Sequence, residues 1–320
     1  MSIPVVIDCD PGVDDALALL YALASPELDV RGVTTVAGNA GLDQVTRNAA
    51  QVLDLAGAPA DLPLVAGLAG PIARTARIPD EPMHGAGGLG GLDLPGSLRA
   101  PGREHAVDWL AEQILAAPGE LTLVALGPLS NVAAMVARHP EAGPALRGIV
   151  VMGGAARCQG NVTPAAEFNF FADPEAARRV LESGLAVRVV GLDVTRAALF
   201  PLEPAERLAA LPGAAGAAGT LLRGFVQRYQ DRFGVAAVPV HDALAVAAVT
   251  HPGLLGYDSG TATVECAGEV TRGALVADLR TPGRARDVRV ARTVDADGFT
   301  RLLTERLAAY ARTRPTADRP

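Results

Sequence analysis

The chain has 320 residues, of which 49% are hydrophobic, 4% aromatic and 20% charged, and its formal net charge is −7. This composition supports a large core of Ala, Val and Leu, and an acidic balance without a basic patch argues against nucleic acid as a partner. Three scattered cysteines without a CxxC pair argue against a disulfide framework or a zinc site. No apolar run is long enough to span a membrane. Because the N-terminus also lacks a signal-like segment, the sequence favours a cytoplasmic protein.

Strand-like apolar segments alternate with alanine-rich helical segments through the first two thirds of the chain. Strands are predicted at residues 3–7, 30–36, 121–125, 148–152 and 187–192. Helices are predicted at residues 13–23, 43–56, 105–116, 131–137 and 174–183. This order is typical of an α/β fold with an open, mainly parallel, doubly wound sheet flanked by helices.

Other segments interrupt or follow this alternation. Residues 84–91 read HGAGGLGG and are predicted to form a mobile loop, while the Ala/Gly-rich and then polar-aromatic run 209–233 is predicted to be a helical lid over a pocket. A β-meander is expected at 260–279 and an amphipathic helix at 297–312. No linker divides the chain, so we expect one domain over residues 1–312 and a disordered tail at 313–320.

The strongest chemical signal is the sequence DCDPGVDD at residues 8–15, which contains Asp8, Asp10, Asp14 and Asp15. These acids stand at the end of a predicted strand and the start of a predicted helix, where open α/β sheets place ligands. Four like charges so close together repel each other, and a bound cation would offset the repulsion. Aspartates also cap helices, but capping explains one or two of these residues and not all four.

Two further signals follow predicted strands. Gly38-Asn39 comes after the second strand, and LGPLSN at 126–131 comes after the third. In the latter, Gly127-Pro128 predicts a tight turn that leaves the carbonyl of Leu126 free to face a ligand. The alternative is a well-made corner between a strand and a helix.

Polar residues also punctuate the segment at 160–177 and the start of the last buried helix. Asn161, Glu167 and Asn169 lie in the first, and alternation would place Glu167 and Asn169 on one side of an extended segment. His241-Asp242 precede the apolar run 243–248. The alternatives are an ordinary Asx-rich loop, and a helix cap with an incidental histidine beside it.

These signals all come near the ends of predicted strands, so we expect them at one edge of the sheet. They are rich in oxygen and poor in sulfur, and oxygen ligands suit a hard cation such as Ca²⁺. The sequence therefore predicts a calcium site at that edge.

In combination these motifs resemble the inosine-uridine preferring nucleoside hydrolase family, over nearly the whole chain from residue 3 to about residue 299. The family signature DxDPGxDDAxAL is present at residues 8–19. Further matches follow in order: TVAGN at 35–39, HGxxG at 84–88, GPLSN at 127–131, EFN at 167–169 and HDA at 241–243. The resemblance implies hydrolysis of the N-glycosidic bond of ribonucleosides, in nucleoside salvage or catabolism, by a homo-oligomer, either dimer or tetramer.

The resemblance also implies how the metal and the attacking water are handled. One Ca²⁺ per subunit would be bound by Asp10, Asp15, Asp242 and the carbonyl of Leu126, with water and ribose hydroxyls completing its shell. Asp10 would take a proton from the metal-bound water, which then attacks C1′ through an oxocarbenium-like state.

The remaining implied roles concern the substrate. Asp14 and Asn169 would bind ribose hydroxyls, Asn161 and Glu167 would hold the 5′-hydroxyl, Asn39 would contact ribose or water, and Met152 would form an apolar wall. A site that pairs with hydroxyls rejects analogues that lack them, so 2′-deoxynucleosides are expected to be poor substrates. A 5′-phosphate would face Glu167, so nucleotides are expected to be poor as well.

The leaving base needs a proton or a hydrogen bond. His241 is the candidate, because the unperturbed pKa of histidine suits proton donation near neutrality, and in the family a histidine here accompanies pyrimidine-preferring and nonspecific members. Gln227 and Tyr229, in the predicted lid, would contact the base, and His84 would close over the ribose. Residues 213–233 match the family poorly, which leaves the preference among uridine, cytidine and purine nucleosides open.

Two other functions are compatible with parts of the sequence. A haloacid-dehalogenase-like phosphatase also has an Asp-x-Asp after its first strand, but it needs a downstream lysine, and the basic residues here are arginine throughout. A calcium-dependent ribose-binding protein without turnover is the other alternative, and binding without hydrolysis would identify it.

Overall fold

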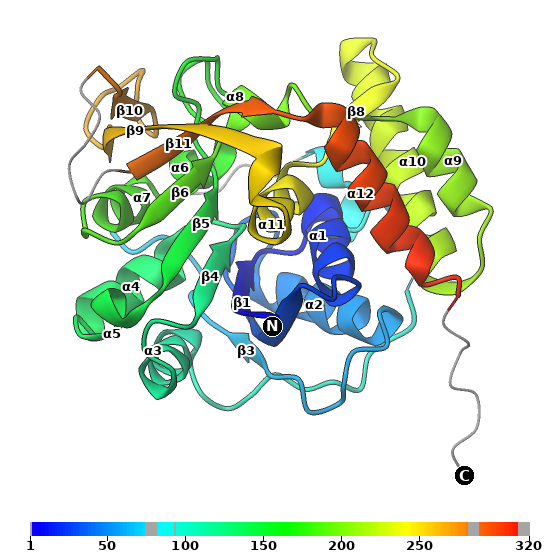
Figure 1. The fold of residues 1–320 in the computed structure, drawn as a ribbon, viewed down its shortest axis with the longest axis horizontal. Coiled ribbons are helices and arrows are strands. Elements are labelled where there is room, and N and C mark those ends of the chain that lie inside the picture. The colour runs from blue at the N-terminus through cyan, green and yellow to red at the C-terminus, as the bar shows by residue number, and fades with distance from the viewer. Residues whose placement is uncertain (1, 74–81, 93, 281–287, 313–320) are drawn as a thin grey trace.

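A nine-stranded sheet forms the centre of the computed structural model, which describes residues 2–73, 82–92, 94–280 and 288–312 (Figure 1). The strands are β1 (Ile3–Cys9), β2 (Leu28–Thr35), β3 (Leu64–Ala66), β4 (Thr122–Ala125), β5 (Gly148–Met152), β6 (Val187–Val190), β9 (Leu255–Val264), β10 (Leu275–Asp278) and β11 (Val288–Val294). Their order across the sheet is β10-β9-β11-β6-β5-β4-β1-β2-β3. All neighbouring pairs from β11 to β3 are parallel, and β9 pairs antiparallel with β11 and β10.

Helices cover both faces of this sheet. The principal helices are α1 (Val13–Leu23), α2 (Leu42–Leu55), α3 (Ala106–Ala116), α4 (Ser130–Arg138), α5 (Ala142–Ala145), α6 (Phe168–Ala172), α7 (Pro174–Leu181), α8 (Leu192–Thr195), α9 (Leu202–Ala209), α10 (Gly213–Phe233), α11 (His241–Thr250) and α12 (Ala296–Ala309). A separate pair, β7 (Leu199–Pro201) and β8 (Ala237–Pro239), flanks α9 and α10 in sequence. No helix of the described segments is long and apolar enough to cross a membrane.

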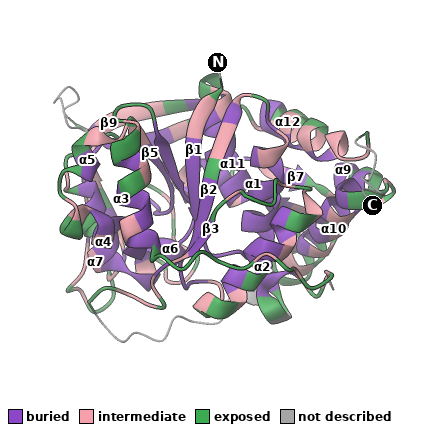
Figure 2. Cartoon of the chain, turned by 90° about the horizontal axis from the view of Figure 1, so that it is seen from below, coloured by how far each residue is buried: buried purple, intermediate pink, exposed green. Residues whose placement is uncertain are grey.

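The alternation of side chains along the strands produces two hydrophobic cores. Val5 and Ile7 of β1 face a core shared with α1, α2, α10, α11 and α12, whereas Val6 faces one shared with α3, α4 and α7. Figure 2 shows the strands buried between these layers. Successive residues of a strand point to opposite faces, so a strand buried on both sides needs an almost continuous apolar run, which β1, β4 and β5 have. The predicted doubly wound α/β fold is therefore confirmed.

The order of the strands places a crevice at the end of β1. The chain moves outward from β1 through β2 to β3, and then returns to β4 on the other side of β1. At such a reversal the loops after the two central strands diverge, and ligands bind in the crevice that they leave. The acidic sequence at 8–15 begins in the last two residues of β1 and runs into α1, and Leu126 follows β4.

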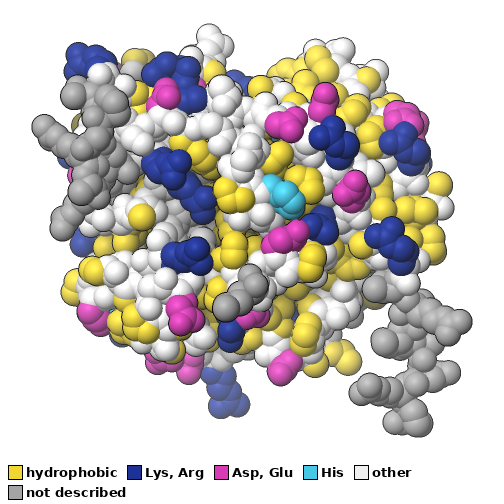
Figure 3. All heavy atoms as spheres, viewed as in Figure 1, with side chains coloured by type: hydrophobic (Ala, Val, Ile, Leu, Met, Phe, Trp, Pro, Cys, Tyr) yellow, Lys and Arg dark blue, Asp and Glu magenta, His cyan; other side chains and the backbone are white. Residues whose placement is uncertain are grey.

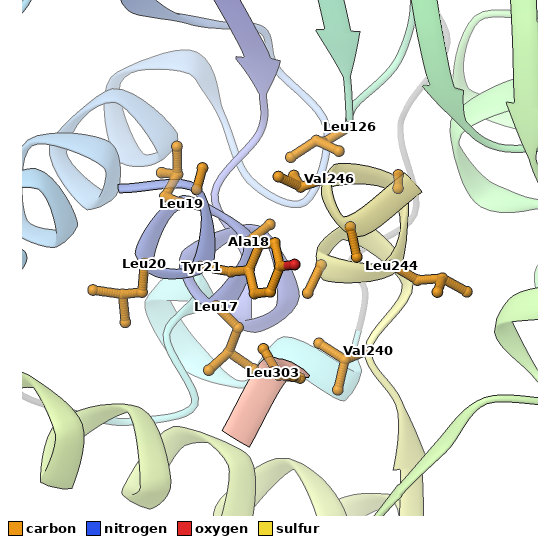
Figure 4. Close-up of a cluster of buried hydrophobic side chains, with 14 of the residues drawn as sticks. Leu17, Ala18, Leu19, Leu20, Tyr21, Leu126, Val240, Leu244, Val246 and Leu303 are labelled. Atoms are coloured by element: carbon orange, nitrogen blue, oxygen red, sulfur yellow. The ribbon is translucent and has the colours of Figure 1, made fainter. Parts of the chain in front are cut away.

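Helices α1 and α11 pack against each other beside the sheet. Figure 4 shows Leu17 of α1 and Leu244 of α11 in one cluster with Leu303 of α12, and all three side chains are fully buried. Both helices begin with acidic residues in their first turn. This packing brings acids that are more than 200 positions apart in the sequence to the same end of the sheet.

The C-terminal part differs from the prediction in its strand order. The β-meander expected at 260–279 corresponds to the antiparallel hairpin of β9 and β10, but β9 starts earlier, at Leu255, and lies between β10 and β11. The unpredicted β11 pairs with β6 and so joins the hairpin to the parallel sheet. The short strand β3 was also missed, since three residues carry too little periodicity to be recognised. The predicted tail at 313–320 lies outside the described residues.

Candidate active site

Asp10 and Asp15 are held by a network at the junction of β1 and α1. The backbone N–H of Asp10 donates to Asp15 Oδ1 at 3.1 Å, and that of Gly12 donates to Asp15 Oδ2 at 3.0 Å. The backbone N–H of Asn39 donates to Asp10 Oδ2 at 2.7 Å, and its amide donates to Asp15 Oδ2 at 3.1 Å. Asn39, which sequence reasoning assigned to ribose or water, therefore also ties the two carboxylates together.

Two glycines allow the chain to approach Asp10 closely. A Cβ at Gly38 would lie 2.0 Å from Asp10 Oδ2, and one at Gly127 would lie 2.5 Å from Asp10 Oδ1. Either side chain would displace the carboxylate, because real Cβ contacts are never so short. The Gly-containing turns after β2 and β4 thus serve to enclose Asp10.

Asp14, Asp15 and Asp242 form a compact group of oxygen donors. Each offers a ligand atom, these atoms lie within 4.8 Å of one another, and all three residues are buried. Asp242 comes from the first turn of α11 and the other two from the first turn of α1. Asp10, which the resemblance assigns to the metal, lies outside this group but is hydrogen-bonded to Asp15 through its backbone.

The electrostatics of this cluster fit a bound cation. Burial, and then repulsion from Asp15, raise the pKa of Asp10 well above its usual range. Burial, and then repulsion from Asp14, raise the pKa of Asp15, and the same two causes raise the pKa of Asp242 well above its usual range. Within the described residues no arginine forms an ion pair with Asp10, Asp15 or Asp242. Buried carboxylates in this state are stabilised by a hard cation, for which oxygen donors are suited.

Asp8 is separated from the other acids of the same sequence motif. Its Oδ1 accepts hydrogen bonds from the Thr34 hydroxyl at 2.5 Å and from the Asn131 amide at 2.8 Å. Burial raises the pKa of Asp8 to about 6 despite these two bonds. Asp8 is still within β1, where successive side chains point to opposite faces of the sheet. Asp10 lies beyond the end of the strand and lines the cavity. Asp8 therefore belongs to the scaffold.

The segment around Glu167 is folded differently from the prediction. Glu167 and Asn169 do not alternate along an extended chain, because residues 168–172 form α6 and Glu167 is its N-cap. Its carboxylate accepts backbone N–H groups of Asn169 at 2.9 Å, Gly154 at 2.8 Å and Phe170 at 3.2 Å. Free N–H groups at a helix start need acceptors, and a buried carboxylate supplies them. Glu167 and Asn169 are brought together by this cap.

Asn169 and Asn161 also have partners within the protein. The Asn169 amide donates to the carbonyl of Leu126 at 2.6 Å and to that of Met152 at 3.1 Å. Asn161 Oδ1 accepts the backbone N–H of Phe168 at 2.9 Å. The Leu126 carbonyl, which the resemblance assigns to the metal, thus carries one hydrogen bond and retains a second lone pair.

Two histidines face the same cavity. His84 lies in the short 3₁₀ turn Pro82–His84, and its Nδ1 accepts the backbone N–H of Val13 at 3.1 Å. The same nitrogen lies 3.7 Å from Asp14 Oδ1. In the loop predicted to be mobile, the Gly87 carbonyl accepts the Asn48 amide at 2.8 Å, and the Gly90 carbonyl accepts Arg228 of α10 at 3.4 Å.

His241 opens α11 with its Nδ1 at 2.7 Å from the Thr195 hydroxyl. Burial, followed by Arg196 and His84, lowers the pKa of His241 to about 3. Sequence reasoning gave this residue the ordinary pKa of histidine, because nothing in the local sequence shows that its ring is buried. The imidazole is neutral near pH 7, so it presents one donor nitrogen and one acceptor nitrogen.

The cavity has a volume of about 320 Å³ and joins the acidic cluster to the lid helix. Its lining contains nearly all of the residues predicted from the sequence, namely Asp10, Asp14, Asn39, His84, Leu126, Met152, Asn161, Glu167, Asn169, Tyr229, His241 and Asp242. Asp15 lies behind Asp10 and is fully buried.

On the face shown in Figure 3, acidic and basic side chains are interspersed rather than gathered into a basic patch.

Gln227 is the predicted site residue that the fold places elsewhere. It lies on the exposed face of α10, where its amide donates to Asp231 at 2.8 Å, and it does not line the cavity. In a helix, residues two apart point in nearly opposite directions, so Gln227 and Tyr229 cannot both face a ligand. The cavity face carries Phe225, Tyr229, Arg232 and Phe233 instead. Their i, i+4, i+7, i+8 spacing was the signal in the sequence that would have identified them.

Comparisons with known proteins identify the family that this chain resembles. The sequence profile described as inosine-uridine preferring nucleoside hydrolase matches residues 5–301. The chain is 40% identical over 316 residues to the pyrimidine-specific ribonucleoside hydrolase RihA of Shewanella sp. strain MR-4, covering 98% of both chains. It is 40% identical over 314 residues to RihA of Citrobacter koseri, covering 97% of this chain and 100% of the relative. Among solved structures, the purine-preferring ribonucleoside hydrolase from Gardnerella vaginalis matches with a TM-score of 0.90 at 31% identity, covering 96% of this chain and 99% of that chain.

Proposed function

The chain belongs to the inosine-uridine preferring nucleoside hydrolase family, and from that membership we propose that it catalyses calcium-dependent hydrolysis of the N-glycosidic bond of ribonucleosides. The products are the free base and ribose, which places the reaction in nucleoside salvage or catabolism. One observation carries the proposal: a single cavity is lined by the buried carboxylates Asp10, Asp14 and Asp242 and also by His241 and the aromatic face of α10. The cavity can hold the sugar against the acids and the base against the lid.

The acidic residues have different roles at the sugar: some would bind the cation and one would act as the base. Asp15, Asp242 and the Leu126 carbonyl, together with Asp10, would hold Ca²⁺, which when bound would orient the ribose diol and make the attacking water more acidic. Asp10 would accept the proton of that water. Burial and repulsion from Asp15 raise the pKa of Asp10, and a bound cation would offset that rise. The surrounding carboxylates stabilise positive charge that develops on the ribose ring.

Four polar residues of the cavity lining select the sugar. Asp14 and Asn169 bind ribose hydroxyls, with Asn169 fixed by its bonds to the Leu126 and Met152 carbonyls. Asn161 and Glu167 hold the 5′-hydroxyl, and the three backbone N–H groups on Glu167 keep its carboxylate in place. Asp14, Glu167 and Asn169 are buried. Because Glu167 and Asn169 are oriented by these bonds before substrate arrives, little ordering of them is needed on binding.

Steady-state release of ribose from a panel of nucleosides tests this function. Uridine, cytidine and inosine are expected to be cleaved, with pyrimidine nucleosides favoured because the relatives of 40% identity carry pyrimidine-specific names. For 2′-deoxyuridine, kcat/KM is expected to fall on the order of 10⁴-fold, since buried groups would lose a hydroxyl partner. Uridine 5′-phosphate is expected to be poor because its charge meets Glu167. Binding of uridine without any release of ribose would refute catalysis and support the ribose-binding alternative.

His241 acts on the leaving base. The substitution His241→Ala is expected to lower kcat for uridine by about 10²-fold, because the departing pyrimidine loses its hydrogen-bond donor. Hydrolysis of 4-nitrophenyl riboside, whose leaving group is stable as an anion, is expected to change by less than about tenfold. The surface variant His139→Ala, on the far side of the sheet, serves as the control. An equal loss on both substrates would exclude His241 as the group that assists departure.

A further inference from the structure

Within the described residues, Thr195 is the one polar group that forms a hydrogen bond with the Nδ1 ring nitrogen of His241. Its Oγ1 is 2.7 Å from His241 Nδ1, and the threonine is only 1% exposed. Among the described residues Thr195 Oγ1 has no other hydrogen-bond partner. A buried hydroxyl proton needs an acceptor, and His241 Nδ1 is the acceptor within reach. The hydroxyl is therefore the donor of this bond.

The direction of that bond decides which ring nitrogen carries the proton. When Nδ1 accepts a hydrogen bond, the neutral imidazole has its proton on Nε2. Nε2 of His241 makes no hydrogen bond within the described part of the chain, and the ring lines the cavity.

Helix α8 holds Thr195 rigidly in this place. The carboxylate of Asp193 accepts the backbone N–H groups of Ala156 and Arg157, each at 2.8 Å. Arg196 donates to the carbonyls of Gln159 at 2.6 Å and Gly160 at 2.9 Å. The residues on either side of Thr195 are thus bonded to the segment that leads to Asn161 and Glu167, so α8 connects the base end of the cavity with the 5′-hydroxyl end.

We propose that Thr195 is a positioning residue that holds His241 as the Nε2–H tautomer, with its donor aimed at the base of the bound nucleoside. This inference rests on the proposed function, since it assigns a role to Thr195 in that same reaction. Thr195 does not contact substrate; it acts through the imidazole. Without its hydroxyl the ring can rotate, or can carry its proton on Nδ1, and then it presents a lone pair to a leaving base that needs a donor.

The test compares Thr195→Val, which keeps the shape and removes the hydroxyl, with Thr195→Ser, which keeps the hydroxyl. Thr195→Val is expected to lower kcat for uridine about tenfold or more with little change in KM, and to leave hydrolysis of 4-nitrophenyl riboside within about twofold. Thr195→Ser is expected to retain most of the activity. In a His241→Ala background, Thr195→Val is expected to cause no additional loss, because both changes remove the same interaction.

A matched control and a spectroscopic readout complete the experiment. Thr250→Val removes another threonine hydroxyl bonded to a histidine Nδ1, that of His251 at 2.9 Å, but neither residue lines the cavity, and its kinetics are expected to match the wild type. Two-dimensional ¹⁵N NMR of the histidine rings is expected to show His241, assigned from His241→Ala, as the Nε2–H tautomer, and Thr195→Val is expected to change that signature. Equal losses on both substrates, additive losses with His241→Ala, or an Nδ1–H tautomer in the wild type would each overturn the proposal. Failure of the wild type to cleave any riboside would instead overturn the proposed function.

Discussion

Replacing Asp10 by Asn is expected to lower kcat for uridine by about 10³-fold or more, because an amide cannot take the proton of the attacking water. The shape of the side chain is kept, and an amide oxygen can still accept the backbone N–H of Asn39, which the carboxylate accepts at 2.7 Å. The measurement is ribose release under saturating uridine with calcium present. Loss in kcat rather than KM would identify the chemical step as the one affected.

The same variant has a second expected effect, of the opposite sign, on stability. Burial and repulsion from Asp15 raise the pKa of Asp10, so a neutral side chain there suits the fold better when no cation is bound. Asp10→Asn is therefore expected to raise Tm in the presence of a chelator. The control is Asp43→Asn, an exposed acid in the first turn of α2 that changes the net charge equally. Turnover within tenfold of the wild type would contradict the assignment of Asp10 as the base.

Removal of the cation is expected to abolish hydrolysis and to lower Tm. A ligand that binds only the folded state at 100-fold excess over its Kd stabilises the protein by about 2.7 kcal/mol, and repulsion among the buried carboxylates adds to the loss when it leaves. Activity and Tm are measured after exhaustive chelation and again after titration with Ca²⁺ or Mg²⁺. Ca²⁺ is expected to restore both more effectively, because it accepts a larger and less regular set of oxygen ligands.

Asp242→Asn provides the variant arm of that experiment. Asp242 reaches the cluster from α11, while Asp14 and Asp15 reach it from α1, so its carboxylate links two helices through the proposed cation. The calcium-dependent rise in Tm is expected to shrink in this variant, and the concentration of Ca²⁺ needed for half-maximal activity is expected to increase. Full activity after chelation, verified by metal analysis, would refute the metal site while leaving the fold and the family unaffected.

Much of the fold follows from short-range patterns. Apolar runs such as residues 3–7 and 148–152 are buried on both faces, and a strand of a parallel sheet has that character wherever it occurs. The helix Val13–Leu23 was predicted at its observed boundaries, because Pro11-Gly12 ends the strand and two acids open the helix. Short-range patterns do not predict the strand Leu64–Ala66, because three residues are too few to show periodicity. They also do not predict the order of the strands at the C-terminal edge of the sheet.

The sequence by itself determined the kind of chemistry and the edge of the sheet at which it occurs, since acids, amides and tight turns follow the parallel strands one after another. Only the tertiary structure decided how each side chain is used. It placed Asp8 among hydrogen-bond donors away from the cavity, joined Asp242 to Asp15, made Glu167 a helix cap, turned Gln227 outward and set Thr195 behind His241. The physical reason is the distance along the chain over which each property is determined. Secondary-structure propensity and periodicity depend on neighbours within a few residues. The burial, contacts and electrostatic surroundings of a side chain depend on segments that meet only when the sheet and its two helical layers have assembled.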